Sequence, residues 1–282
     1  MQLKRKSCRI GMGKLYHTIG QATYWYEVDG EGTPIVMLHG FTGSTKTWQH
    51  VKSAFGTGYQ IIAIDLPGHG KTQASHVRTM EMCCTDLHAL FQFLGLEKIH
   101  LVGYSMGGRT ALSYALNYPA MIQSLILESA SPGIADESER RLRMEADEKL
   151  AERIERDGVQ AFVDYWQDIP LFVSQKSLPS KVQEDIRRER LSQTTEGLAQ
   201  SLRAMGTGAQ EPWWSHLESF ECPVKLIVGE LDPKFIAMNK KMQKHLKSSK
   251  MNICDNAGHA VHVEKPEIFG KLVRKFITHN RL

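Results

Sequence analysis

The sequence predicts an α/β fold: a mostly parallel, doubly wound sheet with a helical insertion between two of its strands. Short apolar runs alternate with longer segments in which apolar residues recur at helical spacing, a pattern typical of strand–helix–strand units. The runs are continuous, as expected of parallel strands that are covered on both faces. Residues 135–218 interrupt this alternation, because they contain no strand-like run and are dense in charged residues.

The positive charge of the chain is concentrated at its N-terminus. The net charge is +4, and the basic residues that precede the first acidic residue are Lys4, Arg5, Lys6, Arg9 and Lys14. Without them the chain is close to neutral, so its composition gives no case for a nucleic-acid surface. Residues 1–17 are predicted to form a basic, disordered N-terminal extension, and they lack the apolar core of a signal peptide.

The cysteine pattern and the hydropathy indicate the compartment. The five cysteines show no C-x-x-C spacing, so they fit reduced thiols better than a zinc site or a redox motif. No apolar run approaches membrane-spanning length. We therefore expect a cytoplasmic protein that works without a membrane, and we expect it to be a monomer.

Each element of the predicted core follows from a local pattern. The strands are residues 22–28, 34–38, 60–64, 99–102, 124–128, 223–229 and 251–254, and the helices are residues 48–55, 79–94, 109–117, 236–246 and 266–279. We assign residues 18–133 and 219–282 to the core and residues 134–218 to a helical lid. An insertion at this point covers the C-terminal ends of the strands, where open α/β sheets bind ligands.

The strand at residues 99–102 leads into Gly103-Tyr104-Ser105-Met106-Gly107, which precedes a helix. This Gly-x-Ser-x-Gly motif between a strand and a helix is the context of a nucleophile elbow, a sharp turn that exposes a serine hydroxyl. Ser105 is therefore the predicted nucleophile. The Met106 N–H lies at a helix N-terminus and is a predicted donor to an oxyanion.

A nucleophilic serine needs a histidine as its base and a carboxylate that orients the histidine. Asp232 and His259 each follow a strand, and they stand in the order serine, acid, histidine. Asp255, in the same loop as His259, is a rival acid, and His262, near the start of the last helix, is a rival base. Helix capping is the alternative role for Asp232. We predict a triad of Ser105, Asp232 and His259.

The loop His39-Gly40-Phe41-Thr42-Gly43-Ser44 follows a central strand and contains two glycines. Such a loop can offer a backbone N–H to a ligand, and we assign this role to Phe41, with an ordinary strand-to-helix turn as the alternative. His69 lies in the next loop of this kind. We expect it to make a structural hydrogen bond and to take no part in catalysis.

Arg109 stands one helical turn beyond Ser105, on the same face of the predicted helix. A guanidinium can bind a carboxylate through two hydrogen bonds, so Arg109 is a candidate ligand for an anionic substrate, with a structural ion pair as the alternative. The lid also holds Arg140, Arg141, Arg143, Arg187, Arg188, Arg190 and Arg203. Most are expected to face water, and one or two that face inward would make a pocket for a polyanion.

Five motifs carry a resemblance to a known family. They are His39-Gly40-Phe41-Thr42-Gly43-Ser44, Gly103-Tyr104-Ser105-Met106-Gly107-Gly108-Arg109, Glu128-Ser129-Ala130-Ser131-Pro132-Gly133, Gly229-Glu230-Leu231-Asp232-Pro233-Lys234-Phe235 and Ala257-Gly258-His259. On these motifs the chain from about Thr18 onward resembles the α/β-hydrolase superfamily. Within it, the chain resembles the 2-succinyl-6-hydroxy-2,4-cyclohexadiene-1-carboxylate (SHCHC) synthases of menaquinone biosynthesis. The basic extension lies outside the family pattern.

The resemblance implies a carbon–oxygen lyase reaction. Pyruvate would be eliminated from 2-succinyl-5-enolpyruvyl-6-hydroxy-3-cyclohexene-1-carboxylate to give SHCHC. Ser105 would act as the base, His259 as its proton acceptor and Asp232 as the orienting group, while the N–H groups of Phe41 and Met106 would stabilise negative charge on a substrate oxygen.

The resemblance also implies the substrate contacts, which are Tyr104, Arg109, Arg143, Arg190 and Trp166, with Tyr165 as the alternative to Trp166. The partner is expected to be a small polycarboxylate. The sequence shows no metal-ligand cluster, phosphate loop or dinucleotide motif, so we expect no metal and no cofactor.

Two other functions use the same features. A carboxylesterase or C–C bond hydrolase would employ the same triad, and a mostly apolar pocket without Arg109 would favour it. A non-catalytic binding protein with a hydrolase fold is the third possibility, and an intact triad argues against it.

Overall fold

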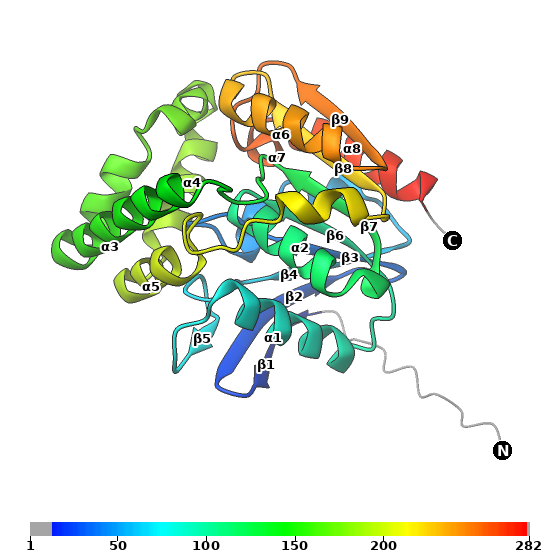
Figure 1. Ribbon diagram of the computed structural model, residues 1–282, viewed down its shortest axis with the longest axis horizontal. Coiled ribbons are helices and arrows are strands. Elements are labelled where there is room, and N and C mark those ends of the chain that lie inside the picture. Colours follow the sequence, from blue (N-terminus) through cyan, green and yellow to red (C-terminus); the bar gives the residue numbers. More distant parts are fainter. Residues whose placement is uncertain (1–12, 281–282) are drawn as a thin grey trace.

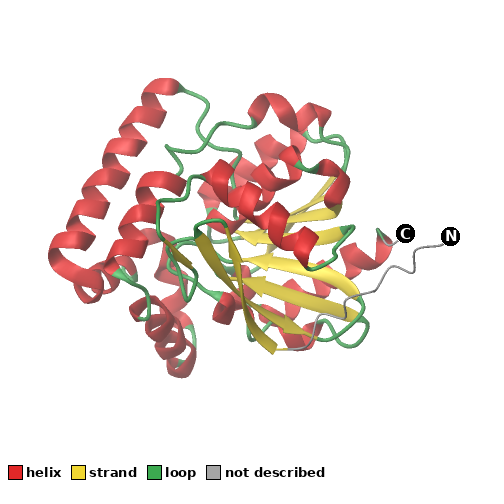
Figure 2. Cartoon of the chain, turned by 90° about the horizontal axis from the view of Figure 1, so that it is seen from below, coloured by secondary structure: helices red, strands yellow, loops and turns green. Residues whose placement is uncertain are grey.

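The computed structural model describes residues 13–280 as three layers, with helices on both faces of one twisted sheet (Figures 1 and 2). Helices α3 (Glu137–Trp166), α4 (Ser180–Leu191) and α5 (Thr195–Met205) form a separate group to one side of these layers. They belong to the segment predicted as a lid, and within residues 134–218, all of them described, no strand is present.

The strands are β1 (Gly13–Ile19), β2 (Ala22–Asp29), β3 (Thr33–Leu38), β4 (Tyr59–Ile64), β5 (Gln73–Ala74), β6 (Ile99–Tyr104), β7 (Ile122–Glu128), β8 (Val224–Gly229) and β9 (Ser249–Cys254). Their order in the sheet is β1-β2-β4-β3-β6-β7-β8-β9, and β5 pairs with β2. The six strands from β4 to β9 in this order run parallel, whereas β1 and β2 are antiparallel to their neighbours. The predicted parallel sheet is therefore confirmed.

The core helices are α1 (Met80–Phe93), α2 (Met106–Asn117), α6 (Pro233–His245), α7 (Val261–Glu264) and α8 (Pro266–His279). Short 3-10 helices are η1 (Thr45–Trp48), η2 (Lys52–Ala54), η3 (Pro119–Met121), η4 (Pro170–Ser177) and η5 (Trp214–Ser219). Apolar residues of α1, α2 and α6 pack on one face of the sheet, and those of η1 and α8 pack on the other.

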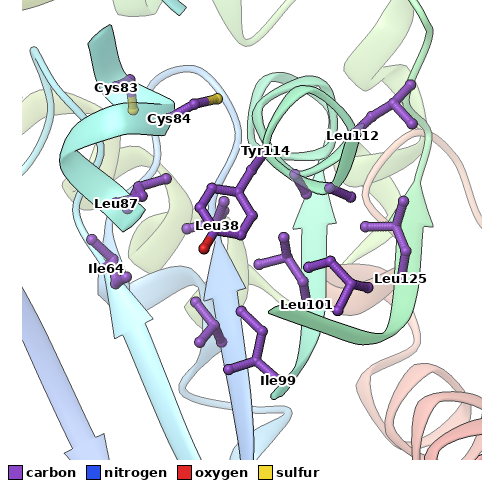
Figure 3. Close-up of a cluster of buried hydrophobic side chains, with 14 of the residues drawn as sticks. Leu38, Ile64, Cys83, Cys84, Leu87, Ile99, Leu101, Leu112, Tyr114 and Leu125 are labelled. Carbon is purple, nitrogen blue, oxygen red and sulfur yellow. The ribbon is translucent and has the colours of Figure 1, made fainter. Parts of the chain in front are cut away.

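Successive side chains of a strand point to opposite faces of the sheet, so the apolar core has two parts, one on each face. In β3, Val36 and Leu38 belong to one buried cluster, while Ile35 and Met37 belong to the other. Figure 3 shows the first cluster, in which side chains of the strands meet those of α1 and α2. Because both faces are covered, these strands appear in the sequence as continuous apolar runs.

The segment predicted as a lid, residues 134–218 and called the lid below, has a small apolar core of its own. It is made by Ala151, Ile154, Phe162, Val163, Leu198, Ala199 and Leu202, from α3 and α5. Gly158 interrupts α3 with non-helical dihedral angles, φ 80° and ψ 169°, so α3 consists of two helical segments. At the surface, Arg203 of α5 donates hydrogen bonds to Glu148 and Glu155 of α3 and so links these two helices.

The structure corrects two predictions for the N-terminal third. Residues 13–17 belong to strand β1 and are not part of a disordered extension, because they pair with β2 and because Tyr16 packs on Trp25 with ring centroids 4.5 Å apart. The rest of the predicted extension, residues 1–12, lies outside the described residues. The helix predicted at residues 48–55 is replaced by η1 and η2, since short connections readily adopt single 3-10 turns.

Two further observations concern the described residues only. Cys83, Cys84, Cys222 and Cys254 are free thiols, and burial raises the pKa of each of them. No helix between residues 13 and 280 is long and apolar enough to cross a bilayer.

Candidate active site

Ser105 lies on a strained turn between β6 and α2. Its φ of 50° and ψ of −109° are unusual for a residue with a side chain, and its N–H donates to the Glu128 carbonyl at 2.8 Å. A Cβ atom at Gly103 would collide with the Gly107 carbonyl, and one at Gly107 would collide with the Leu38 carbonyl. The two glycines of the motif are therefore required by close approach of the backbone.

The structure brings Ser105, His259 and Asp232 together. The Ser105 hydroxyl lies 3.0 Å from His259 Nε2, and His259 Nδ1 lies 2.7 Å from Asp232 Oδ2. A carboxylate only accepts, so Nδ1 carries the proton and Nε2 is free to accept the serine proton. Asp232 Oδ1 also accepts from the Phe235 N–H at 3.2 Å, so this residue caps α6 as well as orienting the histidine.

The rival acid and base lie elsewhere. Asp255 is exposed, and the carboxylate on His259 is that of Asp232. His262 is fully buried, with Nδ1 within 3.0 Å of the Glu128 carboxylate and Nε2 2.9 Å from Thr47 Oγ1. Its hydrogen bonds hold α7 against β7 and η1, which is a structural role.

The loop of residues 39–44 is held from inside by the His39 ring. Nδ1 donates to the Gly40 carbonyl at 2.8 Å, and Nε2 accepts from the Leu66 N–H at 2.9 Å. Burial, with a smaller contribution from His69, lowers the pKa of His39 to about 3. His69 makes the expected structural hydrogen bond, to the Pro67 carbonyl at 3.1 Å.

Ser105 opens into a cavity of about 650 Å³ between the sheet and the lid. Phe41 and Met106, the predicted oxyanion donors, both line it. Most of the wall is aliphatic or aromatic, with ionisable groups at separate positions. The basic side chains are Arg109, Arg143, Lys149, Arg153 and Lys234, and the acidic side chain is Asp147. The lining therefore combines an apolar surface with an excess of positive charge.

Arg109 is buried, with 8% of its surface exposed, and its Nη1 donates to the Gln210 side-chain carbonyl at 2.9 Å. The ion pair considered as its alternative role is not formed with any described carboxylate. The pKa of Arg109 is lowered to about 10, first by burial and then by the nearby Arg143, while Asp147 opposes the shift. A buried guanidinium with a neutral partner still gains from an anion in the cavity.

The lid residues are divided between two cavities. Arg143, Tyr165 and Trp166 line the Ser105 cavity, and Arg143 Nε donates to Asp147 Oδ1 at 2.8 Å. Arg190 lines a neighbouring cavity of about 470 Å³ instead. It donates to Gln175 Oε1 at 3.0 Å and lies over the ring of Phe172, which lines both cavities.

Tyr104 lines the Ser105 cavity and is buried, and burial raises the pKa of its hydroxyl well above the ordinary value. Its ring lies 5.4 Å from that of His259 and 4.6 Å from that of His262. The residue before the nucleophile therefore forms part of the wall next to the base.

Sequence reasoning missed four residues of the site. Lys149, Arg153 and Lys234 line the cavity, and only the Asp-x-Lys-Phe motif hinted at one of them. Glu264 accepts from the Gly258 N–H at 2.7 Å and from the Ser174 hydroxyl at 3.1 Å, so it fixes the loop that presents His259. Between residues 13 and 280 no group of three histidine, cysteine or acidic residues is placed to hold a metal ion.

Comparison with known proteins shows which family the chain belongs to. The family model described as the alpha/beta hydrolase fold matches residues 33–266. A Bacillus subtilis (strain 168) protein, provisionally named 2-succinyl-6-hydroxy-2,4-cyclohexadiene-1-carboxylate synthase, is 45% identical over 262 residues, which cover 90% of this chain and 94% of that protein.

Two solved structures are also similar. MenH from S. aureus has a TM-score of 0.87 and 36% identity, over 90% of this chain and 98% of that one. A thermophilic esterase from Thermogutta terrifontis with bound malate has a TM-score of 0.83 and 27% identity, over 95% of this chain and 99% of that one. The chain therefore belongs to the α/β-hydrolase fold family and, within it, to the family of SHCHC synthases.

Proposed function

We propose that this protein eliminates pyruvate from 2-succinyl-5-enolpyruvyl-6-hydroxy-3-cyclohexene-1-carboxylate to form SHCHC in menaquinone biosynthesis. The similarity to SHCHC synthases supports this proposal. The substrate and product names define the step. A proton leaves ring carbon 2, a double bond forms between carbons 2 and 3, the existing double bond moves to carbons 4 and 5, and the carbon 5–oxygen bond breaks. The leaving enolate takes up a proton and becomes pyruvate.

We assign the proton transfer to Ser105. His259 Nε2 accepts the proton of the serine hydroxyl, and the serine oxygen then accepts the proton from carbon 2. Asp232 holds the resulting imidazolium through its hydrogen bond to Nδ1. Because carbon 2 carries the succinyl ketone, the carbanion is stabilised as an enolate. We assign the N–H groups of Phe41 and Met106 as the donors to that enolate oxygen.

The observation that carries the proposal is Arg109. This buried guanidinium lies one turn of α2 beyond Ser105, faces the same cavity, and has a neutral amide as its hydrogen-bond partner. A substrate carboxylate would supply the missing negative charge. We propose that Tyr104, Arg143 and Trp166 complete this surface, and that residues 134–218 act as a lid over it.

The structure gives less support to Arg190 as a substrate contact. It lies in the neighbouring cavity behind Phe172, so direct contact with the same substrate requires Phe172 to move. We retain Arg190 as a proposed substrate contact on this condition.

Pyruvate release tests the proposed function. The purified protein is supplied with the enolpyruvyl cyclohexene substrate, and p-nitrophenyl acetate is tested in parallel. We expect rapid pyruvate formation that Ser105→Ala removes, with poor ester hydrolysis. Rapid ester hydrolysis without pyruvate would instead support a carboxylesterase. That second function is favoured by the largely apolar cavity wall and by the similarity to the esterase structure.

A further inference from the structure

The loop of residues 39–44, called here the oxyanion loop, is held by the lid as well as by the core. The Ser44 hydroxyl donates to Glu189 Oε1 at 2.6 Å, and the Gln193 amide donates to the Gly43 carbonyl at 3.2 Å. Gln193 Oε1 also accepts from the Gly70 N–H at 2.9 Å. Gln193, two residues after α4, therefore joins the oxyanion loop to the neighbouring loop of the core.

The oxyanion loop needs such support because part of it is strained. Thr42 has a φ of 68°, which is uncommon for a residue with a β-branched side chain. It stands between Phe41, whose N–H is a proposed oxyanion donor, and Gly43, which accepts from Gln193. A backbone N–H contributes to transition-state stabilisation only if it points to the developing charge before the reaction. The contacts from α4 thus lie where they can fix the direction of the Phe41 N–H.

The Phe41 side chain is held by the lid too. Its ring lies 5.6 Å from that of Trp166 and 6.1 Å from that of Phe162, in edge-to-face geometry. These contacts come from α3, whereas Glu189 and Gln193 come from α4 and the residues just after it. Two separate parts of the lid therefore touch the same short loop.

We propose that Glu189 and Gln193 are positioning residues, which hold the oxyanion loop so that the Phe41 N–H faces the enolate oxygen. The inference rests on the proposed function, since it concerns the oxyanion donor of that reaction. Glu189 and Arg190 are neighbours on the last turn of α4. Arg190 is held by its own hydrogen bond to Gln175, so its position does not depend on the contact of Glu189 with Ser44.

The test compares Glu189→Ala, Glu189→Gln and Gln193→Ala with wild type in the pyruvate assay. We expect Glu189→Ala and Gln193→Ala to lower kcat by about tenfold or more while KM changes by less than about threefold, because the lost interaction acts in the transition state. Glu189→Gln keeps an oxygen that accepts from Ser44, so it restores most of kcat. Amide hydrogen exchange of residues 40–45 is expected to accelerate in the two alanine variants.

Arg203→Gln is the matched control. It breaks the hydrogen bonds that join α5 to Glu148 and Glu155 of α3, within the lid and away from the oxyanion loop. We expect it to leave kcat and the exchange of residues 40–45 unchanged. If Glu189→Ala does not fold, Gln193→Ala carries the same comparison.

The outcomes are distinct. Absence of pyruvate release by wild type would reject the proposed function. Release by wild type with unchanged kcat in Glu189→Ala and Gln193→Ala would overturn the positioning role alone. A loss of kcat in Arg203→Gln equal to that in the two alanine variants would also overturn it, because a general effect of lid stability would then explain both.

Discussion

The core and the lid place their site residues by different means. Ser105, Asp232 and His259 follow strands β6, β8 and β9, whose direction and register are fixed by hydrogen bonds to neighbouring strands. The lid residues are carried by helices that pack through one small apolar cluster. A strand end allows little choice of position, whereas a helix can rotate or slide. Site geometry is therefore rigidly determined in the core and depends on side-chain packing in the lid.

The largest expected effect comes from the core nucleophile. Ser105→Ala removes the group that takes the proton, so kcat for pyruvate release is expected to fall by about 10⁴-fold or more. Folding should be little affected, because the serine hydroxyl bonds only to His259 among the described residues. Steady-state kinetics and a thermal melt measure the two effects. Substantial residual turnover would show that another group acts as the base.

The second largest effect is expected at Arg109, which lies in the core and faces the Ser105 cavity. Arg109→Ala is expected to raise the activation barrier for kcat/KM by about 2–4 kcal/mol, the range for losing one partner of a buried charge pair. Arg109→Lys is the matched control for charge without the planar donor pair. Wild-type kinetics in Arg109→Ala would contradict an anion-binding role.

A third prediction concerns the pH dependence of core stability. Burial lowers the pKa of His39 to about 3 and that of His69 to about 4, below the ordinary value of 6.5. Between pH 6.5 and 4 these two histidines therefore bind more protons in the unfolded chain than in the folded one. The stabilisation is complete above pH 6.5 and is lost as the pH falls, by about 1.4 kcal/mol per pH unit for each histidine.

Denaturant unfolding at several pH values measures this slope. His69→Gln removes one titrating group and is expected to reduce the slope by about 1.4 kcal/mol per pH unit. His50→Gln is the control, because His50 is exposed. Equal slopes in wild type and His69→Gln would mean that His69 titrates normally in the folded state.

The smallest effect is expected in the lid. Arg143 is paired with Asp147 and its side chain is 40% exposed, so Arg143→Ala is expected to cost about 1 kcal/mol in kcat/KM. The same pyruvate assay gives the value. A loss as large as that of Arg109→Ala would show that the lid closes more tightly over the substrate than this structure does, and would remove the contrast between the two regions.

The same contrast explains what the sequence predicted. The parallel strands were recognisable because burial on both faces makes them continuous apolar runs, and the proposed triad was recognisable because its members follow those strands in a fixed order. Strand β1 was missed because it lies at the edge of the sheet with alternate residues exposed. Its polar sequence gives no apolar run.

The lid was predicted as helical, but its inward-facing residues were only partly identified. Arg143 lines the Ser105 cavity, whereas Arg190 lies in the next cavity, and Arg153 lines the first cavity without having been singled out. Which face of a helix points inward depends on the packing of α3 against α5, and a local pattern in one charged helix does not specify it.

The interruption of α3 at Gly158 divides one wall of the Ser105 cavity between two helical segments. Arg143, Asp147 and Arg153 precede this glycine, and Tyr165 and Trp166 follow it, so the charged and aromatic parts of the cavity wall belong to separate helical segments. A Cβ atom at Gly158 would meet open space, so the positive φ, and not crowding, is what favours glycine there. Both segments pack in the same lid cluster, and the Arg153 guanidinium lies over the Tyr165 ring, 4.4 Å from its centroid. The charged and aromatic parts of the cavity wall therefore form one continuous surface although two helices supply them.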